Sequence, residues 1–110
     1  MILSNYLFYT YIDDISSVTV KSLTDASPLV VIVNQEVVFT AVVTSLAGTT
    51  YYTPVTYQWD FGDGNNKVST EASVIYSYST PGVWNITLTA ANNVSSAIFI
   101  GKINILEGLF

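Results

Sequence analysis

The stretch of sequence that decides the fold is Tyr57-Gln58-Trp59-Asp60-Phe61-Gly62-Asp63-Gly64. Aromatic side chains occupy every second position of its first part, so an extended strand places Trp59 and Phe61 on one face. Burial of two such rings contributes about 1.5–3 kcal/mol each, which makes this face the core side. Asp60 lies on the other face, where its carboxylate can accept backbone N–H groups of the following turn. Gly62 begins that turn, predicted over residues 62–66, because glycine adopts positive φ angles without a Cβ penalty.

The same period of two recurs along the rest of the chain, and turn residues separate the runs. The predicted strands are residues 18–20, 29–33, 37–44, 55–61, 74–78, 84–90 and 97–106. In the sixth of these, Trp84 and Ile86 point to the core and Asn85 points away from it. Residues 29–33 fit either a short buried strand or an edge strand that crosses between two sheets.

About seven short strands in 110 residues predict an all-β fold, an immunoglobulin-like antiparallel β-sandwich. Valine, isoleucine and threonine make up about a third of the chain, and these side chains favour pleated sheets over helices. No segment has the period of a helix. A small closed barrel is the structural alternative.

Composition excludes several classes of function. The chain has no histidine and no cysteine, which removes histidine-based triads, cysteine nucleophiles, disulfides and zinc sites with these ligands. Its net charge of −5 argues against a nucleic-acid partner, and no apolar run is long enough to span a bilayer. Half of the residues are hydrophobic and only 10% are charged. We therefore expect an apolar surface that a partner or a modification covers.

Two blocks of the chain resemble a known family. Residues 57–64 resemble the WDFGDG motif of the PKD (polycystic kidney disease) domain, and residues 76–92 resemble its pattern H-x-Y-x-x-P-G-x-Y-x-V-x-L-x-V-x-N. Tyr76 replaces the family's histidine, Trp84 its tyrosine and Ala90 a larger aliphatic residue, and all three stay apolar or aromatic. The positions matched to the family's fold motif are Trp59, Asp60, Phe61, Gly62, Asp63, Gly64, Tyr78, Pro81, Gly82, Trp84 and Asn92.

The resemblance implies one PKD-type β-sandwich domain over residues 16–106. Residues 1–15 are then a linker or N-terminal extension, and residues 107–110 a C-terminal linker. The tail, residues 103–109, also resembles the junctions between tandem repeats in polycystin-type ectodomains. The apolar first dozen residues could add as a strand to a neighbour, which is the basis of a further interpretation as a filament or layer subunit.

Asp60 and Asp63 are the carboxylates that merit attention as a site. We interpret both as turn residues bound to backbone N–H groups, and predict no catalytic residue and no cofactor. The alternative is a calcium ion held by Asp60 and Asp63, because hard cations take carboxylate and carbonyl oxygens from loops, as some bacterial PKD-like modules do. Serine and threonine hydroxyls have no histidine or well-placed lysine to activate them.

Two N-x-[ST] sequons, at Asn85 and Asn93, are candidate glycosylation sites. Asn85 is predicted to point outward from its strand and Asn93 to lie in the next turn. Tyr51 and Tyr52 could form part of a protein or carbohydrate contact, although local packing explains them as well.

Together these features predict a non-enzymatic extracellular or cell-surface module of a larger protein. Such a module would hold neighbouring domains apart and contact protein or carbohydrate partners, without direct membrane insertion. The alternatives are an accessory substrate-binding module of a secreted hydrolase and a calcium-binding PKD-like module.

Overall fold

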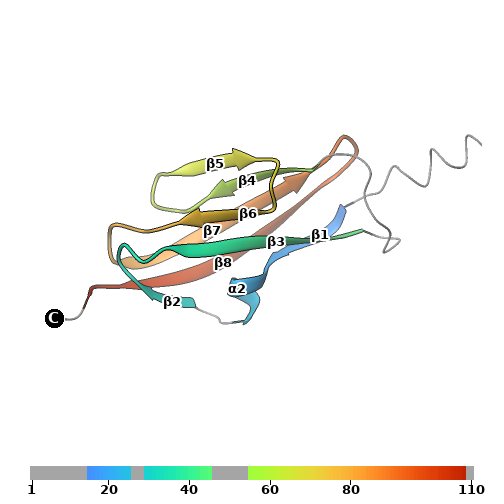
Figure 1. Cartoon of the computed structure of the whole chain (residues 1–110). Coiled ribbons are helices and arrows are strands. Elements are labelled where there is room, and N and C mark those ends of the chain that lie inside the picture. The colour runs from blue at the N-terminus through green and yellow to red at the C-terminus, as the bar shows by residue number, and fades with distance from the viewer. Residues whose placement is uncertain (1–14, 26–28, 46–54, 109–110) are drawn as a thin grey trace, which may run out of the picture.

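The computed structural model describes residues 15–25, 29–45 and 55–108. Its elements are β1 (Ile15–Val20), α2 (Lys21–Asp25), β2 (Leu29–Ile32), β3 (Val37–Ser45), β4 (Thr56–Asp60), β5 (Asn66–Ser69), β6 (Ser73–Tyr76), β7 (Gly82–Ala91) and β8 (Ser96–Leu106). The strands form two sheets packed face to face, one in the order β1-β3-β6 and one in the order β2-β8-β7-β4-β5 (Figure 1). The predicted sandwich is confirmed.

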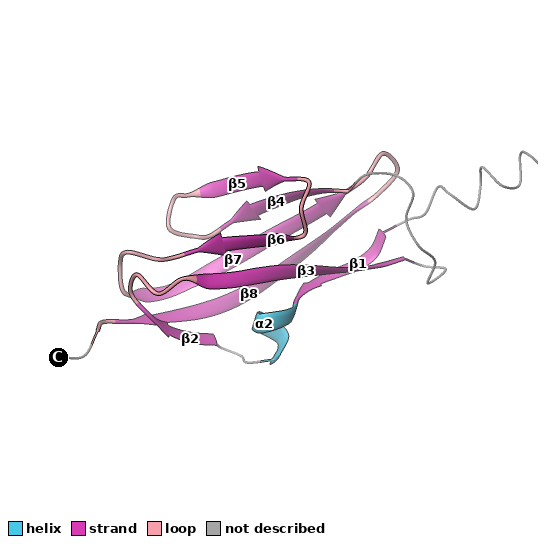
Figure 2. Cartoon of the chain, in the orientation of Figure 1, coloured by secondary structure: helices cyan, strands magenta, loops and turns pink. Residues whose placement is uncertain are grey.

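Three features of the described chain differ from the sequence prediction (Figure 2). β5 lies within a segment for which no strand was predicted, and it pairs antiparallel with β4 through the tight turn. The helix α2 is a single turn of five residues, too short for a helical period to show in the sequence. The pair β2–β8 is parallel, whereas the other pairs are antiparallel.

The chain crosses between the sheets at α2, because β1 belongs to the three-stranded sheet and β2 to the five-stranded one. β2 is an edge strand, which decides the interpretation of residues 29–33 in favour of the crossing edge strand. Leu23 of the helix is buried and closes the core at this point. Gly101 lies against this side chain: a Cβ added there would lie 2.9 Å from the Phe99 ring and 3.0 Å from Leu23 Cδ1, so both side chains would have to shift.

The core lies between the two sheets and centres on aromatic rings from both. Trp59 is 1% exposed, and its ring centroid lies 6.1 Å from that of Phe39 and 6.4 Å from that of Phe61. The other large, fully buried side chains are Val20, Tyr78, Ile86, Leu88, Ile103 and Ile105. Trp84 is half-buried and stacks on Tyr78 at the end of the sandwich. The predicted faces of β4 and β7 are therefore correct.

The outer faces of both sheets carry large exposed apolar side chains. On the described strands these are Val30, Ile32, Val38, Val42, Val68, Ile75, Val83, Ile98, Ile100 and Leu106. No helix in the described part of the chain is long and apolar enough to cross a membrane. All of these exposed side chains except Leu106 are valine or isoleucine, which favour strands. The outer sheet faces are therefore apolar, as the low fraction of charged residues predicted.

Replacement of Trp59 by alanine should lower the free energy of unfolding by about 3–5 kcal/mol. The indole N–H of Trp59 has no hydrogen-bond partner among the described residues, so this loss comes from packing alone. Urea unfolding followed by circular dichroism measures it. Val68→Ala is the control, because Val68 is 60% exposed on the neighbouring strand and should change stability little. A Trp59→Ala midpoint close to that of the wild type would contradict this core.

Candidate functional site

The turn between β4 and β5 is held by the two carboxylates of the motif. Asp60 Oδ1 accepts the backbone N–H of Gly62 at 3.0 Å, and Asp63 Oδ1 accepts that of Asn65 at 3.1 Å. The backbone N–H of Phe61 donates to the Asn65 carbonyl at 3.1 Å, which closes the hairpin. Both aspartates thus act on the backbone of their own turn, the arrangement expected of Asx residues.

Tyr76, which replaces the family's histidine, fastens this turn to the three-stranded sheet. Its hydroxyl donates to Asp63 Oδ2 and accepts from the Asn65 side-chain amide at 2.7 Å. Its ring stacks on Phe61 with centroids 3.8 Å apart. Burial, and then the hydrogen bond to the Asp63 carboxylate, raise the pKa of Tyr76. The position therefore keeps an aromatic ring and adds a hydroxyl that connects two side chains of the turn.

Tyr78 binds the same turn from inside the core. Its hydroxyl donates to the Phe61 carbonyl at 2.8 Å, and the residue is 1% exposed. Its ring lies edge-on to that of Phe61, at 86°. Burial, with a smaller contribution from the charge of Asp63, raises the pKa of Tyr78 far above its ordinary value.

Gly62 lies against the backbone of β7. It has φ of +85°, and a Cβ at this position would lie 2.4 Å from the carbonyl oxygen of Asn85. Gly64 also has positive φ, +98°, but its added Cβ would meet nothing within 4 Å. Both glycines are required by conformation, and Gly62 is required by space as well.

Asp60 Oδ1 and both oxygens of Asp63 are thus directed to the turn that they build. Among the described residues, no three His, Cys, Asp or Glu side chains gather as a metal site would require. Tyr51, Tyr52 and residues 1–14 lie outside the described residues.

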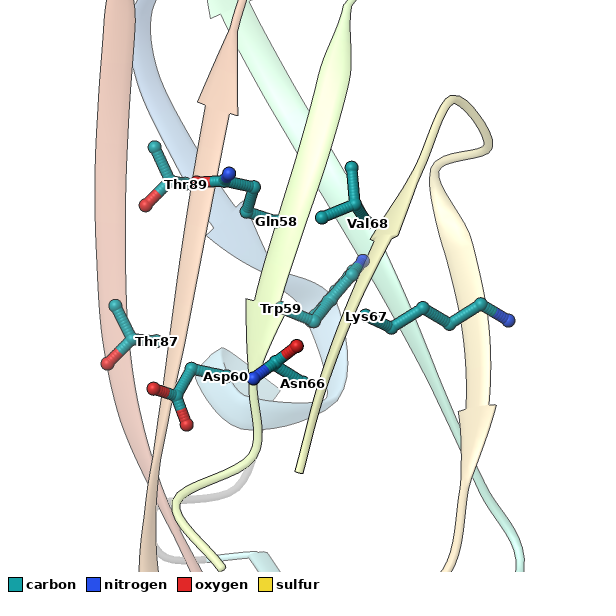
Figure 3. A pocket seen from close by; sticks show the side chains of 8 residues that line it. All are labelled: Gln58, Trp59, Asp60, Asn66, Lys67, Val68, Thr87 and Thr89. Carbon is teal, nitrogen blue, oxygen red and sulfur yellow. The ribbon is translucent and has the colours of Figure 1, made fainter. Parts of the chain in front are cut away.

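A second group of polar side chains lies on the outer face of the five-stranded sheet, over β5, β4 and β7. A pocket of about 320 Å³ opens there (Figure 3). In its first row Gln58 pairs with Val68 and Thr89, and in its second row Asp60 pairs with Asn66 and Thr87. Trp59 and Lys67 complete the lining.

These pocket side chains differ from those of the turn in their hydrogen bonding. Within the described part of the chain, the side chains of Gln58, Asn66, Thr87 and Thr89 make no hydrogen bond, and Asp60 uses only Oδ1. Sequence analysis placed Asn85 on the outer face of its strand, the face that Thr87 and Thr89 share by alternation. It did not find the pocket, because the strand that carries Asn66 was not predicted. Polar residues alternating with core residues in both 56–60 and 85–89 were the available signal.

The two sequons lie at exposed positions. Asn85 is exposed on β7, between half-buried Trp84 and buried Ile86, and pairs across the sheet with Lys102. Asn93 is exposed in the turn from β7 to β8. Asn92 shapes that turn, since its Oδ1 accepts the backbone N–H groups of Val94 and Ser95 at 2.9 and 2.8 Å.

Replacement of Tyr78 by phenylalanine tests its buried hydroxyl. At pH 7 the variant should lose about 1–2 kcal/mol, because the Phe61 carbonyl loses its donor. Above about pH 10 the unfolded chain releases the Tyr78 proton while the folded chain, whose pKa is raised, retains it. The stability that the hydroxyl contributes below that pH is then lost as pH rises. The difference between wild type and variant should shrink from pH 7 to pH 11 in urea unfolding; an unchanged difference would contradict the raised pKa.

Comparisons with known proteins agree with this fold. The sequence profile of the PKD domain matches residues 23–98. A structure that reports the promiscuous specificity of carbohydrate-binding modules from the β-sandwich superfamily is 26% identical, with a TM-score of 0.63. It covers 87% of this chain, which spans only 35% of that one. A comparison with curated protein sequences found no relative.

Two human PKD domains share the architecture. The domain of the VPS10 domain-containing receptor SorCS2 is 18% identical, with a TM-score of 0.63, over 88% of this chain and 78% of that one. The domain of KIAA0319 is 14% identical, with a TM-score of 0.59, over 87% of each chain. At these identities the likeness shows the fold. With the profile match over most of its length and the motif turn built as described, the chain belongs to the PKD domain family, whose domains are not catalytic in themselves.

Proposed function

We propose that this PKD domain is a non-enzymatic module of a larger extracellular or cell-surface protein, where it spaces neighbouring domains and contacts protein or carbohydrate partners. One observation carries this proposal: the carboxylates of the motif are committed to backbone N–H groups of their own turn. Glycoside hydrolysis uses a pair of carboxyl groups. Of these two aspartates only Asp60 has an oxygen left for the pocket, because Asp63 Oδ1 and Oδ2 accept from the Asn65 backbone and the Tyr76 hydroxyl. The extracellular setting is supported by the family, which is typical of secreted and surface proteins.

The path of the chain suits a spacer. The backbone N–H of Ile15 donates to Ser95 Oγ at 2.6 Å, so the start of β1 lies beside the start of β8. β8 then runs through eleven residues to the opposite end of the sandwich (Figure 1). At about 3.3 Å per residue, the described chain enters and leaves some 35 Å apart. Modules joined through such ends would extend in a row.

The partner class is supported by the carbohydrate-binding structure, which is larger than this chain. An accessory substrate-binding module of a secreted hydrolase is the second candidate, because such a module would also contact a carbohydrate. In the calcium-binding alternative Asp60 could ligate through Oδ2, but Asp63 Oδ2 would have to give up its hydrogen bond from the Tyr76 hydroxyl.

The isolated domain should hydrolyse no ester, glycoside or peptide substrate, and millimolar calcium should leave its melting temperature nearly unchanged. Hydrolysis that is lost in Asp60→Asn or Asp63→Asn would contradict the non-enzymatic proposal. A calcium-dependent rise of several degrees that Asp63→Asn abolishes would favour the calcium-binding alternative. Magnesium at the same concentration is the control for general ionic effects.

We also propose that Asn85 carries an N-linked glycan when the domain passes through a eukaryotic secretory pathway. Asn85 is exposed and followed by Thr87, whereas Asn93 has a serine acceptor. Intact-mass spectrometry of secreted protein should show one main glycan that Asn85→Gln removes. Asn93→Gln is the matched control. If the Asn85→Gln variant keeps the glycan mass of the wild type, Asn85 is not the preferred site.

A further inference from the structure

We infer that the pocket over β5, β4 and β7 binds one ring of a neutral polysaccharide. The inference rests on the proposed role as an interaction module and assigns a ligand class and residues to it. Its basis is a contrast between neighbouring groups of side chains. Asp63 of the turn has hydrogen bonds on both carboxylate oxygens, whereas the side chains of Gln58, Asn66, Thr87 and Thr89 in the pocket make none within the described part of the chain. A pocket of about 320 Å³ also falls in the range of small-molecule sites.

The pocket presents a mixed set of hydrogen-bonding groups from three adjacent strands. Asp60 Oδ2 can only accept, the amides of Gln58 and Asn66 both donate and accept, and threonine hydroxyls do both. Strands about 4.8 Å apart hold these groups in two parallel rows. A sugar ring carries neighbouring hydroxyls that each donate and accept, so it can satisfy donors and acceptors in both rows.

The charges at the pocket favour a neutral ligand. Asp60 is an acceptor that repels phosphate, sulfate and carboxylate groups. Lys67 pairs with the core-facing Trp59, and its side chain extends away from Asp60 (Figure 3). A cationic ligand would meet a single carboxylate that already accepts one backbone N–H. The remaining oxygen, Asp60 Oδ2, can accept a hydrogen bond from a sugar hydroxyl, and the ligand then needs no charge of its own.

The opposite sheet also has a pocket, of about 310 Å³, but its lining of Lys21, Ser22, Val38 and Thr40 contains no side-chain amide and no carboxylate. On its outer face Thr40 and Ser73 share a hydrogen bond of 2.9 Å, and Val38 pairs with Ile75. The Thr40 hydroxyl is thus already engaged by Ser73. The combination of amide, carboxylate and hydroxyl groups distinguishes the pocket over β5, β4 and β7 from the one on the opposite sheet.

The affinity of a single module should be weak. The ring of Trp59 points into the core, so it offers no stacking platform, and Val68 is the apolar contact on this face. A dissociation constant in the millimolar range corresponds to about −4 kcal/mol. Modules in a row could raise the apparent affinity by multivalency.

The test is an NMR titration of ¹⁵N-labelled domain produced in bacteria, so that no glycan at Asn85 borders the pocket. The probes are methyl β-glucopyranoside, methyl α-mannopyranoside, methyl β-galactopyranoside and N-acetylglucosamine, each up to about 50 mM. At least one probe should shift the amide signals of β4, β5 and β7 saturably. Glucuronate and inorganic phosphate serve as the anionic comparison.

Two variants remove hydrogen-bonding groups at nearly constant shape, Thr89→Val and Gln58→Met. Together they should weaken binding about five- to tenfold. Thr19→Val is the matched control, since Thr19 is a half-buried threonine on β1, in the opposite sheet. The amide spectra of all variants verify that they fold.

The inference is overturned if no neutral probe shifts these signals, if the shifts lie elsewhere, if the pocket variants bind as the wild type does, or if an anion binds there more tightly. In these cases the spacer role stands, because it does not depend on the pocket. Turnover of a glycoside substrate by the same sample would instead contradict the proposed non-enzymatic function. The two failures are thus distinguished in one set of experiments.

Discussion

The hydrogen bond from the Tyr78 hydroxyl to the Phe61 carbonyl is the constraint on which the rest of the structure depends. Phe61 follows β4 in the five-stranded sheet, and Tyr78 lies where the chain leaves β6 of the other sheet for β7. The bond therefore joins the two layers at the point where the chain passes between them. It also satisfies a carbonyl that the turn would otherwise leave unpaired in the core.

Around this bond, the conformation of the turn and the packing of the core rings depend on each other. Phe61 lies between Tyr76 on one side and Trp59 on the other, and Tyr76 in turn holds Asp63 and Asn65. A change to the turn would thus displace rings, and a change to the rings would displace the turn. Most motif positions are accordingly explained by folding, and of the two turn aspartates only Asp60 also contributes an oxygen to the proposed pocket.

Alternation of apolar and polar residues predicted the strands that face the core on one side and solvent on the other. β4 and β7 are of this kind, and their orientations were correct residue by residue. β5 was missed because its residues are nearly all exposed, so no period of two appears. The parallel direction of the β2–β8 pair has no sequence signal either, because a short apolar edge strand has the same residue pattern in parallel and antiparallel pairs. The pocket needed β5 to place Asn66 beside Asp60, and so it was found only in the structure.

The opposite positions of the two ends have a mechanical consequence. β2 and β8 run in the same direction, and the described chain enters the sandwich at the end where β8 begins. If neighbouring domains pull on the two ends, as the spacer proposal implies, the tension acts along the strands and not across them. A pull on the start of β1 acts first on its bonds with β3. The load then passes to the backbone hydrogen bonds of the parallel β2–β8 pair, extended by the bond from the Val33 N–H to the Leu106 carbonyl, and these bonds bear it together in shear. If β2 ran antiparallel to β8, the bonds between them would open one at a time.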